Sequence, residues 1–500
     1  MKAARLIFGL CLVGFLSNCS LERSDPGDPG FFGDMTNGGP AVYGGSYNFI
    51  PGDVYNTVEE NPFVQVAEQP VSTFSIDADG ASYANIRRFI HQDNQMPPKA
   101  AVRTEELINY FNLDYAYTGG AHPISLQGEV SQCPWNTTNK LVRIGIKGKP
   151  IAPNELPPSN FVFLIDVSGS MKGEDRLELL KNGFKYFVDE LAANDRVAIV
   201  TYAGSAGVVL ASTPGTHKTK IKQAIDALGS GGSTAGAQGI ITAYEIAQQN
   251  FIEGGNNRIV LGTDGDFNVG PSSQDELVSL IEAKRDLGIF LTVLGVGRGN
   301  LNDGGLEQIA NNGNGTYEYI DNIEQLRKVF VFEYSKFFTV AKDVKVQLEF
   351  NPANVEAYRL IGYENRLLNE EDFEDDTEDA GEIGANQNIT ALYEIVPKSN
   401  PDFRTVPTFT IDFRYKHPDE QSSIPLQLEI FDEGKSFPEA TDFMKFVSGI
   451  AAFSMVMTDS PYKGSSNYDE VLSWLDNVDL KDEHGFQSEF RSIVEMAKGL

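Results

Sequence analysis

The stretch FVFLIDVSGSMKGEDRLELLKNGF, residues 161–184, decides the fold of this chain. Its apolar run ends at Asp166, and Ser168 and Ser170 follow on alternate residues before a helical pattern begins over 174–192. A short apolar run followed by an amphipathic helix is typical of a buried strand in a parallel sheet with its crossover helix. The acid and the two hydroxyls therefore stand at the carboxyl end of a strand, where open α/β sheets bind ligands.

The same alternation of strand and helix continues over residues 159–338. Short runs rich in Val, Ile and Leu between amphipathic segments predict a mostly parallel sheet with helices on both faces. The fold class is thus α/β, with a Rossmann-like, doubly wound sheet. The predicted strands are 161–166, 196–204, 207–211, 258–264, 290–297 and 316–320, and the predicted helices are 174–192, 218–229, 234–250, 274–287, 302–311 and a last one ending near 338.

Two further oxygen-bearing residues are expected to converge on the same sheet edge. Thr234 lies in the glycine-rich GSGGSTAG, and Asp264 ends the strand RIVLGTD. Together with Asp166, Ser168 and Ser170 they form a set of hard oxygen donors without His or thiolate, which suits Mg²⁺, Mn²⁺ or Ca²⁺ better than zinc. Because three of the five donors are neutral hydroxyls, the ion would keep residual positive charge and an open position for an external carboxylate.

The motif set DVSGS, a threonine in a glycine-rich loop and TDG resembles the metal-ion-dependent adhesion site of von Willebrand factor type A domains. Asp166, Ser168 and Ser170 match its first part, Thr234 its second and Asp264 its third. The resemblance implies that the three hydroxyls coordinate the ion directly and that the aspartates act largely through water.

The flanking sequence is similar to a bacterial family. The segments NPFVQVAEQPVSTFSIDADGASYANIRRFI, YRLIGYENRLL, DAGEIGANQNITALYEIVP and DSPYKG resemble the YfbK-like von Willebrand type A lipoproteins. This resemblance covers about residues 60–500, and it implies the fold and the metal site without naming a partner.

The N-terminus resembles an export signal. Lys2 and Arg5 precede LIFGLCLVGFL, an apolar run too short to span a bilayer. LSNCS follows, and it resembles the lipobox of bacterial lipoproteins, in which the cysteine, here Cys19, is acylated. We therefore expect a chain lipid-anchored to a bacterial membrane in the cell envelope, on the periplasmic side or at the cell surface. An ordinary secretory signal with an accidental cysteine is the alternative.

The rest of the chain divides by composition and periodicity. Because predicted strands flank the α/β segment on both sides, we expect those at 125–148 to join those at 343–432, so that the α/β domain is inserted into one β-sandwich. The predicted parts are a signal peptide (1–18), a Gly/Pro-rich tether (19–60), an N-terminal mixed α+β region (61–158), the type A domain (159–338), a β-rich domain (339–435) and a C-terminal helical region (436–500).

Charge and cysteine usage exclude several classes of function. The chain has 40 basic and 70 acidic residues, a net charge of −30, whereas nucleic acids are bound through Lys and Arg. We expect no nucleic-acid partner. Of the three cysteines, only Cys133 lies outside the N-terminal segment, so no disulfide framework is predicted and Cys133 is expected to be buried.

No catalytic motif accompanies the metal donors. Ser168 lies in DVSGS and not in G-x-S-x-G, and the five histidines are scattered without H-E-x-x-H. We therefore predict a binding protein and not an enzyme, with no small-molecule substrate, whose metal ion captures an Asp or Glu side chain of a protein ligand. A structural scaffold of an envelope complex with a metal-braced fold is the alternative, and a metal-dependent hydrolase the third.

Residues 370–382, EEDFEDDTEDAGE, hold nine acids and no base. They are interpreted as a solvated loop between strands. A sharper hypothesis is that they supply calcium ligands, or an internal carboxylate that occupies the adhesion site.

Overall fold

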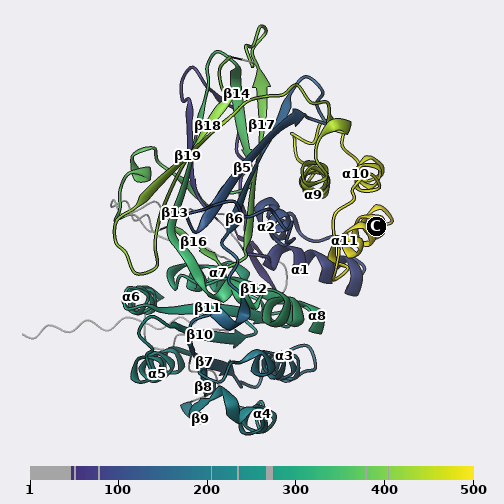
Figure 1. Ribbon diagram of the computed structural model, residues 1–500. Helices are drawn as coiled ribbons and strands as arrows, with labels where there is room; N and C mark the ends of the chain where they lie inside the picture. The colour runs from purple at the N-terminus through teal and green to yellow at the C-terminus, as the bar shows by residue number, and fades with distance from the viewer. Residues whose placement is uncertain are drawn as a thin grey trace, which may run out of the picture. The chain divides into compact units, whose positions relative to one another are not determined.

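Strand β7 (Ser159–Asp166), the first strand of the α/β pattern, lies inside a six-stranded sheet of the computed structural model (Figure 1). Every residue of β7 is buried, which explains why its sequence is continuously apolar and does not alternate. The structure describes residues 47–49, 52–76, 79–203, 205–232, 236–265, 274–377, 380–403 and 405–500.

The α/β sheet has the strand order β12–β11–β10–β7–β8–β9. Neighbouring strands are parallel, except that β9 is antiparallel to β8. From β7 the chain adds β8 and β9 on one side and then returns to add β10, β11 and β12 on the other. The boundary between β7 and β10 is therefore the topological switch point, and the predicted doubly wound, mostly parallel sheet is confirmed. The other strands are β8 (Arg196–Ala203), β9 (Ser205–Pro214), β10 (Asn256–Thr263), β11 (Ile289–Val296) and β12 (Tyr317–Ile320).

Helices cover both faces of this sheet, as Figure 1 shows. Alternate residues of β7 serve opposite faces: Phe163 stacks on Phe184 at 4.3 Å between ring centroids, whereas Val162 and Leu164 belong to a separate core with Ile240. One face carries α3 (Leu177–Glu190), α4 (Lys218–Asp226) and α8 (Ile323–Arg327), and the other carries α5 (Gly236–Gln249), α6 (Gln274–Arg285) and α7 (Asp303–Asn312).

Two antiparallel sheets form a sandwich from segments on both sides of the α/β part. In the first, β6 pairs with β17, with Val142 opposite Tyr393; in the second, β4 pairs with β13, with Phe74 opposite Val346. The predicted joining of the flanking strands is thus confirmed. The first sheet contains β3 (Val64–Gln65), β14 (Val355–Ile361), β17 (Asn388–Pro397), β6 (Lys140–Gly148) and β5 (Ile124–Gln132); the second contains β15 (Leu367–Leu368), β4 (Val71–Ser75), β13 (Thr339–Phe350), β18 (Phe409–Lys416), β19 (Ile424–Ile430) and β16 (Gly381–Gly384).

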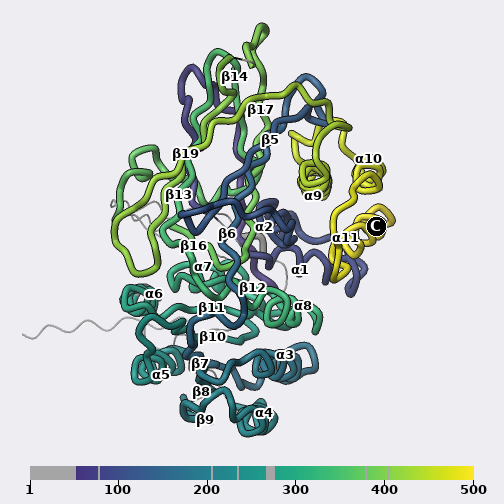
Figure 2. Tube along the Cα trace, viewed as in Figure 1, coloured from purple at the N-terminus to yellow at the C-terminus, as the bar shows by residue number. Residues whose placement is uncertain are grey.

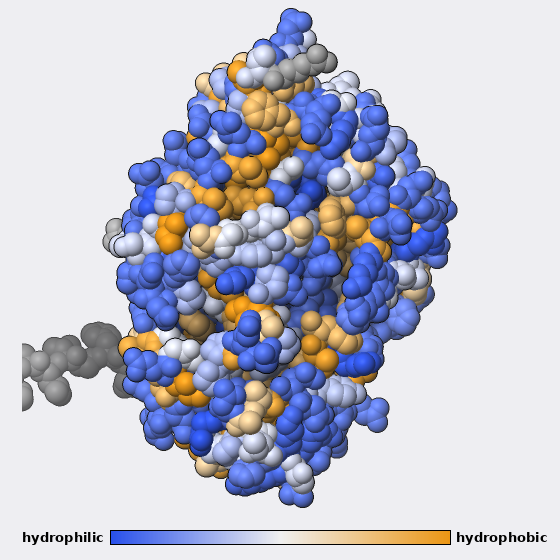
Figure 3. Space-filling view, in the orientation of Figure 1, coloured by the Kyte–Doolittle hydropathy of each residue, from blue (hydrophilic) through white to orange (hydrophobic). Residues whose placement is uncertain are grey.

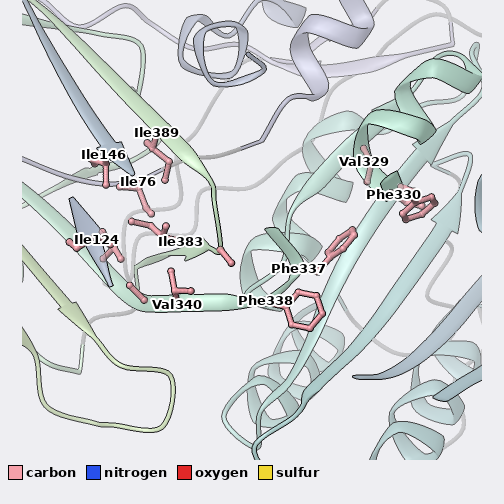
Figure 4. Packing of buried hydrophobic residues seen from close by; sticks show 14 of the residues in the cluster. Ile76, Ile124, Ile146, Val329, Phe330, Phe337, Phe338, Val340, Ile383 and Ile389 are labelled. Atoms are coloured by element: carbon pink, nitrogen blue, oxygen red, sulfur yellow. The ribbon is translucent and has the colours of Figure 1, made fainter. Parts of the chain in front are cut away.

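Aromatic side chains join the two sheets of the sandwich. Phe350 of one sheet stacks on Tyr358 of the other, with ring centroids 4.3 Å apart, and meets Tyr393 edge-on at 5.5 Å. The hydrophobic core also continues into the α/β part. Figure 4 shows Phe337 and Phe338 at the end of that part and Val340 at the start of β13, all in one buried cluster.

The helices outside the α/β part pack around a second core. Buried Arg87 ties them to the α/β part, because it forms an ion pair of 2.5 Å with Asp321 and another of 2.9 Å with Glu489 of the last helix. Figure 2 shows this last helix beside α1. Cys133 is buried in the same core, as predicted. These helices are α1 (Ala81–Arg87), α2 (Thr104–Asn109), α9 (Asp442–Thr458), α10 (Tyr468–Leu475) and α11 (Phe486–Lys498).

The end of the predicted tether is part of the packed structure. Strand β2 (Val54–Asn56) pairs with β1 (Tyr47–Phe49), and the Val54 amide donates to the Leu301 carbonyl at 2.7 Å. Tyr55 is 1% exposed, and Asp53 is buried against Arg88 at 2.9 Å. Residues 52–56 therefore differ from the flexible segment expected from their composition, because contacts with residues far along the chain hold them.

The face shown in Figure 3 is mostly hydrophilic, with separate hydrophobic patches. In the part of the chain that the structure describes, no helix is both long enough and apolar enough to cross a membrane.

The acidic segment 370–382 is described except for 378 and 379, and it bonds to the sandwich. Lys345 Nζ donates to the carbonyl of Asp372 at 2.8 Å, and Asp376 forms a 3.4 Å ion pair with Arg414. From sequence the segment is interpreted as a solvated loop between strands; in the structure these contacts hold it against the sandwich, and Gly381 and Glu382 belong to strand β16.

Candidate metal centre

The two predicted aspartates lie side by side at the switch point of the α/β sheet. Asp166 is the last residue of β7, and Asp264 follows directly after β10, whose Gly262 is paired in register with Ile165. The carboxyl ends of two parallel neighbours thus bring together residues almost a hundred positions apart. The strand assignments made from sequence are sufficient to place this pair.

The DVSGS loop folds back on its own aspartate. The Ser168 amide donates to Asp166 Oδ1 at 2.8 Å, and the hydroxyl oxygens of Ser168 and Ser170 are 2.9 Å apart. On the other side, the Thr263 hydroxyl donates to Asp166 Oδ2 at 3.2 Å. Both carboxylate oxygens of Asp166 are therefore oriented by neighbours, and the two serine hydroxyls gather next to it.

The glycine-rich loop is fastened to the same place by its backbone. The Gly231 amide donates to the Val167 carbonyl at 2.7 Å, and the Gly169 amide donates to the Gly232 carbonyl at 3.1 Å. Gly232, which is thus held next to the DVSGS loop, precedes Thr234 by two residues in the sequence. Thr234 itself lies outside the described residues, and so does Cys19.

Asp264 has an unusual environment for a buried acid. The residue is 0% exposed, and neither of its carboxylate oxygens has a hydrogen-bond partner among the described residues. An isolated buried carboxylate costs several kcal/mol unless it is neutralised or paired, on the order of 2–7 kcal/mol even for an uncharged polar group. A cation between Asp264 and Asp166 would remove this cost, so the residues present fit a bound metal ion.

Asp166 responds to the same surroundings. Burial, and after it the negative charge of Asp264, raises the pKa of Asp166 above its ordinary value, although hydrogen bonds from Ser168 and Thr263 act in the opposite direction. Two buried carboxylates at one sheet edge repel each other, and a divalent cation is the natural counter-charge.

The chemistry of the available ligand atoms also limits which metal ions the site could bind. Within the described ranges, no group of three or more His, Cys, Asp and Glu side chains is placed to hold a metal. A metal at this edge would therefore depend on the hydroxyls of Ser168 and Ser170 in addition to the two carboxylates. Hydroxyl and carboxylate oxygens favour Mg²⁺, Mn²⁺ or Ca²⁺.

Sequence reasoning missed two residues that support the site. Thr263 was read only as part of the TDG motif, yet its hydroxyl bonds to Asp166. Arg176 donates to the Ser170 carbonyl at 2.6 Å and to the Arg298 carbonyl at 2.7 Å, so it ties the metal loop to the loop after β11. No local pattern indicates the second role, because its partner lies more than a hundred residues away.

The loop after β10 also needs its glycine. Gly265 has φ +98°, and a Cβ atom there would lie 2.6 Å from the Asn302 amide nitrogen. A cavity of about 510 Å³ opens next to Gly265, lined by glycines and by the side chains of Asn56, Asn300 and Asn302. The lining of this cavity carries no charged side chain and is polar apart from Val54.

Comparison with known proteins agrees with this geometry. Residues 160–331 match the family model described as von Willebrand factor type A domain, residues 50–143 match one described as von Willebrand factor, and residues 335–500 match one described as Uncharacterized protein YfbK, C-terminal. Type A domains commonly bind a divalent metal ion and generally mediate interactions between proteins, and they are typically not enzymes.

Among relatives, the chain is 39% identical over 470 residues to Uncharacterized protein YfbK of Escherichia coli (strain K12), covering 89% of this chain and 81% of that protein. A UPF0353 protein of Mycobacterium sp. (strain KMS) is 31% identical over 195 residues, which cover 34% of this chain and 57% of that relative.

Two solved structures are similar over part of the fold. BatB from Bacteroides thetaiotaomicron is 26% identical, with a TM-score of 0.31 over 36% of this chain and 98% of BatB. A von Willebrand factor type A protein from Catenulispora acidiphila is 16% identical, with a TM-score of 0.42 over 77% of this chain and 91% of that chain. On the extent of its identity to the Escherichia coli relative, the chain belongs to the YfbK family of proteins with a von Willebrand factor type A domain.

Proposed function

We propose that this protein captures an acidic side chain of a protein partner through a divalent cation, Mg²⁺ in the first place, at the carboxyl edge of its type A sheet. Ser168, Ser170 and Thr234 would hold the ion, with Asp166 and Asp264 completing its surroundings. The supporting observation is the buried carboxylate of Asp264, which has no partner among the described residues.

The arrangement of the chain's own groups explains how such a site would select a carboxylate. The bound ion would supply the positive charge that attracts the partner's Asp or Glu. Asp166 is held in one orientation by Ser168 and Thr263, so its oxygens cannot turn outward to compete with the partner. The serine hydroxyls are neutral, so they leave part of the ion's charge uncompensated.

The polar cavity beside Gly265 would contribute specificity. Its lining consists of glycines, amide side chains and Val54, so it offers hydrogen bonds without a competing charge. A partner segment that carries the acid could place backbone or side-chain polar groups there. The metal would then supply the charge interaction, and the rim would supply the directional contacts.

The cell envelope is the proposed location, with Cys19 as a lipid anchor. The contact between Val54 and Leu301 fastens the chain that follows the anchor to the loop after β11, at the same sheet edge as Asp264. Residues 19–46, which precede β1, could reach at most roughly 100 Å if fully extended. The metal edge would therefore stay within that distance of the membrane that carries the anchor.

The first test is metal titration of residues 20–500 by calorimetry, with Mg²⁺ and Mn²⁺. The wild-type protein should bind one ion, and Asp264→Asn should weaken binding by about 100-fold. Asp226→Asn is the matched control, because it removes an exposed carboxylate elsewhere in the same domain. Equal affinity in all three proteins would refute the metal site.

The second test is capture from cell-envelope extract with chemical crosslinking. A partner retained by the wild-type protein in Mg²⁺, and lost both in EDTA and with Asp166→Ala, would support carboxylate capture. If the same proteins are retained in every condition, the ion serves only to brace the fold and the scaffold alternative holds.

A further inference from the structure

A second polar cavity, of about 190 Å³, lies where the type A domain meets the sandwich. It is lined by Arg258 near the start of β10, at the opposite end of that strand from Asp264. The strand rises about 3.3 Å per residue, so the two sites are about 20 Å apart along it. Ile76 and Phe337, which Figure 4 labels, also line this cavity. It is therefore separate from the metal centre.

Arg258 is the residue that makes this cavity unusual. It is 3% exposed, and its two terminal nitrogens donate to neutral oxygens: Nη1 to the Thr292 hydroxyl at 2.9 Å and Nη2 to the Phe337 carbonyl at 3.1 Å. Its Nε is buried without a hydrogen-bond partner, and within the described ranges no carboxylate oxygen lies within 4.0 Å of its guanidinium.

Other buried arginines have, among the described residues, the carboxylate partner that Arg258 lacks. Arg87 pairs with Asp321 at 2.5 Å, Arg88 pairs with Asp53 at 2.9 Å, and Arg103 pairs with Asp303 at 2.7 Å. Removing a charge from water is costly unless an opposite charge compensates it. In keeping with this, burial lowers the pKa of Arg258 to about 10, with partial opposition from the charge of Glu382.

The cavity contains a second hydrogen-bond donor without a partner in the part of the chain that the structure describes. The Thr316 hydroxyl oxygen is buried without a partner and belongs to the lining of this cavity. The charged groups of the lining are three bases, Arg258, Lys336 and Arg366, and two acids, Asp79 and Glu382. Lys336 is already paired with Glu318 and Glu333, and Arg366 with Asp79 and Glu307, so among the described residues Arg258 is the base of the lining that has no ion pair.

The cavity is larger than the space that one water molecule needs. One water molecule needs only roughly 10–15 Å³ of such space, so the cavity has room for a small molecule of several non-hydrogen atoms. A guanidinium edge offers directed N–H donors that match the oxygens of a carboxylate, phosphate or sulfate.

We propose that this cavity binds a small oxyanion, with one carboxylate or phosphate group held by Arg258 Nε and the Thr316 hydroxyl. The residues of the site come from both sides of the junction: Arg258 and Thr316 from the type A domain, and Ser75 and Arg366 from the sandwich. The bound anion stabilises the contact between these two parts. It is a ligand and not a substrate, and it does not depend on the metal-based function proposed above.

The test uses inorganic phosphate, sulfate and acetate as probes, at constant ionic strength with sodium chloride as the reference salt. The measurements are made in EDTA, which excludes an anion bound to metal at the other site, and are then repeated with Mg²⁺ in place of EDTA. Calorimetry and thermal unfolding of the full-length protein should show saturable binding of at least one probe, with Kd below ~1 mM and a melting temperature that rises to a plateau.

Two variants separate the site from a general salt effect. Arg258→Gln should weaken binding by at least about tenfold, and Thr316→Val, which keeps the shape of the side chain, by a factor of roughly three to ten. Arg298→Gln is the matched control, because it removes an exposed arginine on the metal edge. It should bind the probe as the wild type does.

Three outcomes would overturn the proposal. These are the absence of saturable binding by all three probes, equal binding by wild type and Thr316→Val, and binding that appears only when metal is restored. If Arg258→Gln fails to fold, the anion affinity of Thr316→Val alone tests the proposal, because this substitution removes one hydroxyl group and no charge.

Discussion

Asp264 and Asp303 are both 0% exposed and belong to the same domain, yet their surroundings differ completely. Asp303 accepts hydrogen bonds from Arg103 at 2.7 Å, from the Tyr317 hydroxyl at 2.9 Å and from Asn85 at 3.3 Å. Asp264 accepts none from the described residues. Burial alone therefore does not show whether an acid is bonded to the rest of the fold; the number of its hydrogen-bond partners does.

The comparison predicts that substitution of Asp303 has the largest effect on stability. Asp303→Asn removes one of the three carboxylates that compensate buried Arg103, the others being those of Glu106 and Glu307, so we expect it to lower the free energy of unfolding by about 3 kcal/mol. Urea denaturation measures this change. Asp286→Asn, an exposed acid beside Arg285, should change stability by less than about 0.5 kcal/mol. A loss below about 1 kcal/mol at Asp303 would show that its contacts carry little of the stability.

The same substitution at Asp264 should have the opposite sign. In EDTA, Asp264→Asn removes an unpartnered buried charge, so the free energy of unfolding should stay the same or rise by about 1 kcal/mol. In Mg²⁺ the variant should lose the metal-dependent stabilisation that the wild type shows, which amounts to about 2.7 kcal/mol at 100 times Kd. Urea denaturation of both proteins with and without Mg²⁺ checks this. A large destabilisation in EDTA would mean that Asp264 has partners in the folded protein.

The contrast between these two aspartates also shows what sequence can predict. The ends of β7 and β10 are set by local apolar runs, so the position of Asp166 and Asp264 could be predicted. The network around Asp303 could not, because Arg103 lies 200 residues away in sequence and no local periodicity connects them.

Strand β14 shows a related limit of sequence. It lies within the range 343–432 in which strands are expected, but Arg359 and Glu356 break the apolar pattern of VEAYRLI, so its own residues do not indicate a strand. In the structure Arg359 is 1% exposed and faces Glu394 at 3.5 Å on the neighbouring strand. A charged residue in a short apolar run suggests a loop as long as its partner on another strand is unknown. Residues 52–56 are assigned to the tether from sequence for the same reason, because their partners lie far along the chain.

A third acid provides a pH-dependent comparison. Burial raises the pKa of Glu364 to about 7, with a smaller contribution from the charge of Glu60, and hydrogen bonds from backbone amides oppose this shift. Between pH 4.5 and 7 the unfolded chain releases the proton of Glu364 while the folded protein keeps it. The contribution of Glu364 to stability should therefore be greatest below about pH 4.5 and fall by about 3 kcal/mol as pH rises to 7.

The variant Glu364→Gln isolates this effect from the other groups that titrate in the same range. The difference in unfolding free energy between wild type and variant, measured by urea denaturation at pH 5 to 8, should favour the wild type progressively less as pH rises. A difference that stays constant with pH would mean that Glu364 is ionised throughout.

The smallest predicted effect concerns Thr263, which orients Asp166 and is not itself one of the proposed metal donors. Thr263→Val removes one hydrogen bond to Asp166 Oδ2 and keeps the shape of the side chain, so it should cost about 1 kcal/mol of stability. Because Asp166 keeps its bond from the Ser168 amide, Mg²⁺ affinity should fall only about threefold, far less than for Asp264→Asn. Calorimetric titration measures both variants side by side. An equal loss in the two would mean that the orientation of Asp166, and not the free carboxylate of Asp264, determines whether the ion binds.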